Sequence, residues 1–196
     1  MPWVRAPQEA IRLKVTLDGL RPPVWRRLLV EDTMPLGDLH MALQAAMGWD
    51  NSHLHLFRVG DEDVGDPRQL DEVSNEATWT VGAIAADGGT SFGYVYDMGD
   101  DWEHTIRIEG REPLDPARAY PACIGGRRAC PPEDSGGPWG FADMLAAVAD
   151  PGDERHAELA EWLGEFDPEA FSVEAAEARV RAWFAPKRTR RPRAKR

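Results

Sequence analysis

Residues 92–108 read FGYVYDMGDDWEHTIRI, and this stretch predicts a β-hairpin around which the rest of the fold is arranged. Two runs of alternating apolar and polar residues flank a short segment of acids and glycine. If Tyr96 pairs with Trp102, one face collects Phe92, Tyr94, Tyr96, Trp102, His104, Ile106 and Ile108. The other face then carries Val95, Glu103, Thr105, Arg107 and Glu109, which suits water. A shift by one residue would mix the two sets, so burial favours this register and leaves residues 97–101 as the connection.

The segments around the hairpin predict an α+β fold. Apolar alternation predicts further strands at residues 11–17, 24–31 and 53–59. Helical spacing predicts helices over residues 36–47, 141–148, 157–163 and 173–184. Residues 60–78 are polar and irregular, and residues 123–140 are too rich in glycine and proline for helix or strand. We therefore expect an antiparallel sheet with a central hairpin, packed against one early helix and a C-terminal helical segment.

The charge of the chain is distributed unevenly. The 196 residues carry a net charge of −11, yet residues 186–196 contain seven basic residues and no acid, which leaves −18 on residues 1–185. We expect residues 1–185 to form one domain and residues 186–196 to be a disordered tail. Because the acidic domain repels phosphates, weak and non-specific nucleic-acid binding through the tail is the only such activity the sequence suggests.

The sequence favours a cytoplasmic protein. No apolar run approaches the roughly 18 residues needed to span a bilayer, and the first ten residues lack the apolar core of a signal peptide. Cys123 and Cys130 should then stay reduced. Their spacing is wider than structural zinc sites prefer, so we expect two free thiols.

Acids and histidines near the hairpin connection suggest two alternatives. Asp97, Asp100 and His104 could bind a divalent cation such as Mg²⁺ or Mn²⁺. Alternatively, the aspartates hydrogen-bond the backbone of a tight turn, and His104 is a buried neutral histidine held by a tyrosine hydroxyl. The ligand set is incomplete, so the second alternative is favoured and no metal or other cofactor is assigned.

Two other segments contain residues suited to a site. His53 and His55 would lie on one face of a strand, a workable metal pair without a third ligand in sequence. Residues 131–137 read PPEDSGG. They lack the Lys-Ser/Thr pair of a phosphate loop. Glu133 and Asp134 could belong to a site or could cap backbone donors in a rigid loop. In either case we expect residues 123–140 to pack near residues 97–101.

Several of these motifs together resemble a known family. They are LKVTL at residues 13–17, PVWRR at residues 23–27, residues 49–57, YVYDMGDDWEH at residues 94–104, CIGG at residues 123–126, and PPEDSGG at residues 131–137. The chain resembles the plasmid pRiA-type ORF-three-like family over roughly residues 10–184, some members of which are labelled insertion-element passenger proteins. The resemblance implies a compact α+β fold and a mobile-element context, and it implies no activity.

Three functions follow as hypotheses. The first is a protein that binds an unknown small molecule or protein in a pocket between residues 97–101 and 123–140. Its candidate contacts are Tyr94, Tyr96, Asp97, Asp100, Trp102, His104, Glu133, Asp134 and Trp139. The second is a metal-assisted hydrolase in which Asp97, Asp100 and His104 hold the ion and Glu133 or Asp134 activates water. The third is a DNA-associated accessory protein that acts through the tail.

Overall fold

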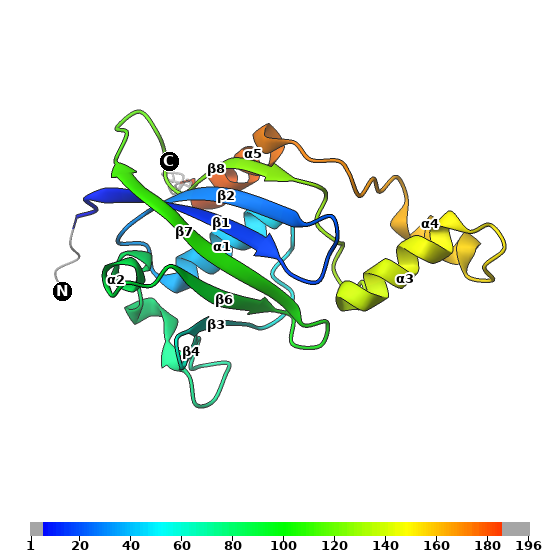
Figure 1. Ribbon diagram of the computed structural model, residues 1–196, viewed down its shortest axis with the longest axis horizontal. Helices are drawn as coiled ribbons and strands as arrows, with labels where there is room; N and C mark the ends of the chain where they lie inside the picture. The colour runs from blue at the N-terminus through cyan, green and yellow to red at the C-terminus, as the bar shows by residue number, and fades with distance from the viewer. Residues whose placement is uncertain (1–5, 186–196) are drawn as a thin grey trace, which may run out of the picture.

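The computed structural model describes residues 6–185 and has an α+β fold built on one eight-stranded sheet (Figure 1). The strands are β1 (Glu9–Leu17), β2 (Val24–Glu31), β3 (His55–Val59), β4 (Glu62–Gly65), β5 (Ser74–Asn75), β6 (Ser91–Tyr96), β7 (Trp102–Pro113) and β8 (Ala122–Arg127). Their order is β5-β4-β3-β6-β7-β1-β2-β8, and every neighbouring pair except β4–β5 is antiparallel. The predicted hairpin, β6–β7, is therefore central.

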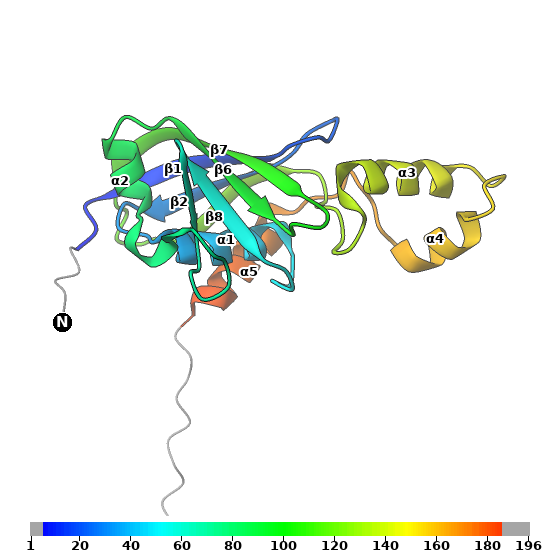
Figure 2. The ribbon, with the colours of Figure 1, turned by 90° about the horizontal axis from the view of Figure 1, so that it is seen from below.

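The helices are α1 (Leu36–Met47), α2 (Val81–Ala86), α3 (Gly137–Ala149), α4 (His156–Leu163) and α5 (Val173–Phe184), with a 3₁₀ turn at Glu76–Thr78. Helices α1 and α5 lie together on one face of the sheet, while α3 and α4 project beyond its end as a pair (Figure 2). The hydrophobic core lies between the sheet and α1 with α5. The predicted early helix and C-terminal helical segment are thus confirmed. Within residues 6–185, no helix has the length and apolar character needed to cross a membrane.

The hairpin has the predicted register. Tyr96 pairs with Trp102 and Tyr94 with His104. The expected inner face is buried apart from Ile108, which is half-buried. Val95 on the other face is also buried, contrary to the prediction. It lies between Leu56 of β3, directly across from it, and Glu103 of β7, which forms an ion pair with Arg58, so neighbouring strands cover it.

Arginine side chains join α1 to the rest of the core. Helix α1 ends at Gly48, whose φ of 95° requires a residue that tolerates the left-handed region. The last carbonyl groups of a helix have no partner within it. Here Arg26 of β2 donates to the Ala46 carbonyl oxygen at 3.0 Å, and Arg179 of α5 donates to that of Ala45 at 2.9 Å. The C-terminus of α1 is therefore held from both the sheet and α5.

The prediction that residues 123–140 form neither helix nor strand is wrong at both ends. Strand β8 covers residues 122–127 on the edge of the sheet, where it pairs with β2. A Cβ on Gly126 would lie 2.5 Å from the Phe171 ring, so glycine is needed there for close packing. At the other end, Pro138 lies in the first turn of α3, where its missing N–H costs little.

Residues 60–78 also contain more structure than expected, namely β4, β5 and the 3₁₀ turn. Helix α2 follows and begins after Thr80, whose hydroxyl oxygen accepts from the Ala83 N–H. These pieces are too short to show a periodic pattern. The predicted disordered tail, residues 186–196, lies outside the described residues.

Candidate functional site

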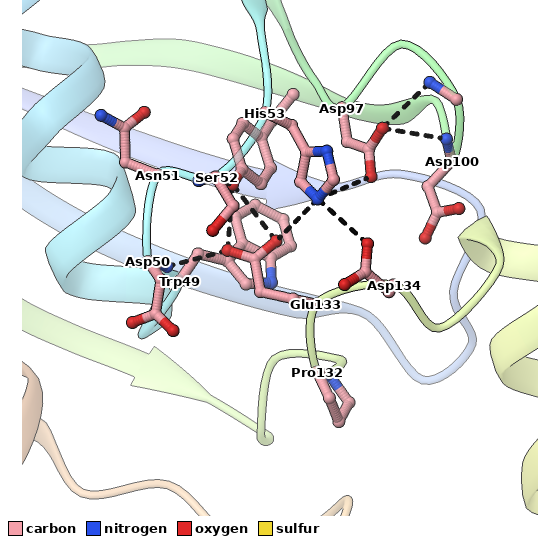
Figure 3. A network of polar contacts seen from close by, with 12 residues as sticks. Trp49, Asp50, Asn51, Ser52, His53, Asp97, Asp100, Pro132, Glu133 and Asp134 are labelled. Atoms are coloured by element: carbon pink, nitrogen blue, oxygen red, sulfur yellow. Dashed lines mark hydrogen bonds and ion pairs between the residues drawn. The ribbon is translucent and has the colours of Figure 1, made fainter.

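The loop after β8 folds back onto the segment between α1 and β3 (Figure 3). Trp49 Nε1 donates to the Pro131 carbonyl oxygen at 2.9 Å, and the Asp50 N–H donates to Glu133 Oε1 at 2.8 Å. Tyr96 links the two segments, since its hydroxyl donates to Glu133 Oε1 at 2.9 Å and accepts from the Ser52 N–H at 3.0 Å. The loop is therefore tied to the end of the central hairpin, where we expected it to pack.

The imidazole of His53 lies among three carboxylates at this junction (Figure 3). Its Nε2 is 3.1 Å from Asp134 Oδ1, 3.5 Å from Asp97 Oδ2 and 3.8 Å from Glu133 Oε2. The ligand atoms of His53, Asp97 and Asp134 all lie within 4.8 Å of one another. Among residues 6–185, this is the one group of three or more histidine, cysteine or acidic side chains that is spaced closely enough to hold a metal ion. We call these three residues the His53 cluster.

The nitrogen at the centre of the His53 cluster is buried and unsatisfied. His53 Nε2 exposes less than 1 Å² to solvent and has no hydrogen-bond partner within the described residues. The carboxylates are close enough for charge attraction but do not meet hydrogen-bond geometry. An orphaned buried imidazole nitrogen is costly, and such groups commonly mark a missing ligand, ion or water.

Local backbone geometry places the carboxylates of the cluster. Asp97 and Asp134 have φ values of 58° and 56°, in the left-handed region that aspartate tolerates better than most residues. Asp97 Oδ1 accepts from the N–H groups of Gly99 at 3.0 Å and Asp100 at 3.3 Å, which fixes the turn and leaves Oδ2 towards His53.

Two of the predicted metal ligands lie elsewhere. Asp100 Oδ2 accepts from the Gly136 N–H at 2.9 Å, which ties the turn to α3. His104 is buried in the core, where burial lowers its pKa to about 4 and keeps it neutral. Its Nδ1 bonds to the Trp102 carbonyl oxygen at 2.9 Å, so the expected tyrosine hydroxyl partner was wrong. The hydrolase hypothesis with Asp97, Asp100 and His104 as one ligand set does not fit this geometry.

The aromatic candidates also do not form a shared contact surface. Tyr94, Tyr96 and Trp102 are core residues with 0%, 0% and 1% exposure, whereas Trp139 on α3 is 89% exposed. Burial raises the pKa of Tyr96, and its hydrogen bond to Glu133 raises it further, so the hydroxyl stays protonated and donates. Of the nine predicted ligand contacts, Asp97, Glu133 and Asp134 lie around His53. Tyr96 donates a hydrogen bond to Glu133.

His53 also lines a polar cavity of about 730 Å³, which Asp97, Glu133 and Asp134 do not line. Its lining comes from the start of α1, from the segment leading into β3 and from the region after β4: Pro35, Gly37, Asp38, His40, Met41, Asn51, Ser52, His53, Leu54, His55, Asp66, Arg68, Gln69, Glu76 and Ala77. Sequence reasoning named only His53 and His55 among these residues.

Two histidines that line the cavity make close contacts with one another and with the core. The rings of His40 and His55 stack with centroids 3.5 Å apart and planes 5° from parallel. His40 also belongs to a closed ring of hydrogen bonds with Gln44, Asn51 and Tyr94, at 2.7–3.1 Å. Burial lowers the pKa of His40 to about 3, so its imidazole is neutral. Its Nε2 is then the nitrogen that donates to Asn51 Oδ1. The Tyr94 hydroxyl therefore has a structural role, because it contacts both His40 and Gln44.

The cavity is acidic. Burial raises the pKa of Asp38, and the nearby charge of Glu76 raises it further. Within residues 6–185, Asp38 has no ion-pair or hydrogen-bond partner for its carboxylate, whereas Glu76 Oε2 is 2.7 Å from His55 Nε2 and Asp66 is paired with Arg68. The site therefore favours groups that carry positive charge or donate hydrogen bonds.

Comparison with known proteins supplies a family. The model of the "Plasmid pRiA4b ORF-3-like protein" family matches residues 9–175. The chain belongs to this family. It is 45% identical over 160 residues, covering 80% of this chain and 82% of the relative, to "Uncharacterized protein y4hQ" of Sinorhizobium fredii (strain NBRC 101917 / NGR234).

A solved structure is also similar. It is described as the "Crystal Structure of Protein of Unknown Function MM3350 from Methanosarcina mazei Go1". The TM-score is 0.80 at 34% identity, and the match covers 86% of this chain and 98% of the other. The resemblance inferred from the motifs is thus confirmed, and neither relative's name supplies an activity.

The pairing of β3 explains why the sequence did not predict the position of His53 beside Asp97 in this pRiA4b ORF-3-like protein. His53 was considered with His55 as a pair on one strand, but β3 begins at His55. Because His55 pairs with Tyr96, and the Asp97 N–H donates to the Leu54 carbonyl oxygen at 2.9 Å, His53 comes to lie beside the turn that starts at Asp97. The two histidines contribute to different clusters.

Cys123 and Cys130 are not joined by a disulfide. Cys123 is buried and Cys130 is half-buried in this family member. Burial raises the pKa of the Cys130 thiol to about 12, so it stays protonated at neutral pH and lacks the reactivity of a thiolate.

Proposed function

We propose that this protein binds a small polar ligand with cationic or hydrogen-bond-donating groups in the cavity beside His53. The cavity itself carries the proposal: its volume of about 730 Å³ lies within the range of small-molecule sites, roughly 300–1,000 Å³. This proposal keeps the binding role expected from the sequence but places the pocket among residues 35–41, 51–55 and 66–77 instead of between residues 97–101 and 123–140.

The cavity supports binding because its floor is already organised. The His40–His55 stack and the ring of hydrogen bonds below it satisfy one another without a ligand. A ligand would therefore not have to order these side chains, and binding to a preformed site avoids that entropic cost.

The charge of the lining supports the ligand class. Arg68 forms an ion pair with Asp66, and Glu76 Oε2 lies 2.7 Å from His55 Nε2, whereas Asp38 has no ion-pair partner among residues 6–185. Asp38 is an exposed residue of the lining, and its carboxylate gains from a partner that carries positive charge. A ligand ammonium or amidinium group beside Asp38 would supply that partner.

Three four-carbon probes of matched length test the proposal: 1,4-diaminobutane, 1,4-butanediol and succinate. We expect the diamine to raise the melting temperature and to bind in calorimetry, because a ligand stabilises the folded state in proportion to ln(1 + [L]/Kd). Succinate should have no effect. Asp38→Asn should weaken diamine binding by about tenfold or more, whereas Asp61→Asn, an exposed acid away from the cavity, should leave it unchanged.

Two results would contradict the proposed ligand class. One is equal stabilisation by succinate and diamine, which would show that charge does not select the ligand. The other is an equal loss of diamine binding in Asp38→Asn and Asp61→Asn, which would show that the diamine responds only to the net negative charge of the protein.

A further inference from the structure

We propose that His53 Nε2, Asp97 Oδ2 and Asp134 Oδ1 bind a divalent first-row cation of the Zn²⁺ or Mn²⁺ class. This site shares His53 with the cavity described above but adds Asp97 and Asp134, which do not line that cavity. It also differs from the ligand set expected from the sequence, in which the imidazole was His104.

The distances from His53 Nε2 to the two aspartate oxygens match those between ligands on one ion, and the three ligand atoms all lie within 4.8 Å of one another. Two ligand atoms that each lie about 2.1 Å from an ion are about 3.0 Å apart at 90° and about 3.4 Å apart at the tetrahedral angle. His53 Nε2 is 3.1 Å from Asp134 Oδ1 and 3.5 Å from Asp97 Oδ2. Small adjustments of the two carboxylates would bring all three atoms around one centre.

The unsatisfied nitrogen is a second and independent observation. Nε2 of His53 is shielded from solvent and has no hydrogen bond within residues 6–185, although carboxylate oxygens surround it. An N–H group at this position would be expected to donate a well-aligned hydrogen bond to one of them. A metal bond to the Nε2 lone pair would satisfy this nitrogen and neutralise the clustered carboxylates.

The surrounding contacts hold the ligands in place. The Asp97 carboxylate is fixed through Oδ1 by the turn, so Oδ2 is presented without further ordering. Glu133 is fixed by Tyr96 and Asp50, and its Oε2 lies 3.8 Å from His53 Nε2, where it can accept a hydrogen bond from a water on the ion. Such outer contacts orient ligands and strengthen metal binding.

The ligand chemistry selects the class of ion. An imidazole nitrogen favours Zn²⁺ and neighbouring transition ions, whereas Mg²⁺ and Ca²⁺ prefer all-oxygen sites. Two carboxylates also suit Mn²⁺. Three protein ligands leave at least one position for water, as in sites where the ion is not purely structural.

The experiment uses the full chain after dialysis against a chelator. Zn²⁺ binding is measured by competition with a chromophoric chelator and Mn²⁺ binding by electron paramagnetic resonance. We expect one ion per chain and weaker binding of Mg²⁺ than of either transition ion. His53→Gln, Asp97→Asn and Asp134→Asn should each weaken Zn²⁺ binding by about 100-fold. Asparagine tolerates the left-handed backbone at both positions, and at position 97 its Oδ1 can keep the turn hydrogen bonds from Gly99 and Asp100.

Matched controls come from the same regions of the protein. Asp101→Asn changes an exposed aspartate in the same turn, with a φ of 54°, and His156→Gln changes a remote histidine on α4. Both should bind Zn²⁺ like the unchanged protein. X-ray absorption of the zinc complex should show one imidazole in the first coordination shell.

Three outcomes would overturn the proposal: no stoichiometric binding of either transition ion, unchanged affinity in Asp134→Asn, or a zinc spectrum with sulfur from Cys123 or Cys130 as ligand. Circular dichroism establishes that each variant is folded. If Asp97→Asn does not fold, Asp134→Asn decides the question, because the Asp134 side chain is 73% exposed and its substitution should not affect folding.

Discussion

Acid should destabilise this protein well above the pH at which most carboxylates titrate, because two core histidines stay neutral in the folded state. Burial lowers the pKa of His40 to about 3 and that of His104 to about 4, against an unfolded value of about 6.5. Below pH 6.5 the unfolded chain therefore binds protons that the folded protein does not. Folding stability is complete above pH 6.5 and falls as the pH drops towards the folded values.

The size of the effect follows from these pKa values. At pH 5.5, one unit below the unfolded pKa, protonation of each unfolded imidazole lowers the free energy of unfolding by about 1.4 kcal/mol. The two histidines together should contribute about 3 kcal/mol of destabilisation between pH 7.5 and 5.5. This is a large share of the roughly 5–15 kcal/mol by which domains are stable.

Urea unfolding at pH 7.5, 6.5 and 5.5 measures this loss, with the midpoint converted to free energy at constant m-value. His40→Gln and His104→Gln should each make the protein less stable at pH 7.5 and should reduce its pH dependence by about 1.4 kcal/mol between pH 7.5 and 5.5. His156→Gln, which removes a histidine outside the core, is the control for the substitution itself. Equal pH dependence in the unchanged protein and in both core variants would refute the reasoning.

Two further predictions concern the loop at the His53 cluster and the basic tail. Tyr96→Phe removes the hydroxyl that donates to Glu133 and accepts from Ser52, and should lower the free energy of unfolding by about 2 kcal/mol. Tyr120→Phe is the control: it loses one exposed contact to Asp115 and should lower the free energy of unfolding by less than about 0.5 kcal/mol. Equal losses of stability in urea unfolding of the two variants would contradict a special role for Tyr96. Any binding of duplex DNA should weaken steeply with salt and disappear on deletion of residues 187–196 without loss of folding; sequence-specific binding by the truncated protein at physiological salt would place the DNA surface in the folded domain.

The sequence predicts well those parts of the fold in which a local pattern is compatible with one structure only. Helix α1 has the predicted bounds, Leu36–Met47, because helical spacing and Gly48 agree. The hairpin register follows because a one-residue shift would expose Trp102 or bury Glu103. Strand β8 fails this test, since Gly126 is required by the Phe171 ring and the Trp25 carbonyl oxygen, whose positions depend on the tertiary fold.

The candidate site was only partly predictable for a related reason. The turn at Asp97 and the loop at Asp134 were expected to pack together, and they do. His53 joins them because β3 pairs with β6 and carries its preceding loop to the same place, which no local pattern encodes. The cavity beyond His53 is assembled from three separate segments and gave no signal in the sequence.

The sequence does not distinguish the aspartates of the hairpin connection from one another. It offers turn formation and metal binding as alternative roles for them. Their side chains have different roles in the fold. Asp100 binds the Gly136 N–H, and Asp101 is exposed. Asp97 accepts turn hydrogen bonds through Oδ1 and presents Oδ2 to His53, so one carboxylate can serve both purposes. The two interpretations are therefore compatible at Asp97, since the same bonds that form the turn hold the free oxygen in the position a cation would require.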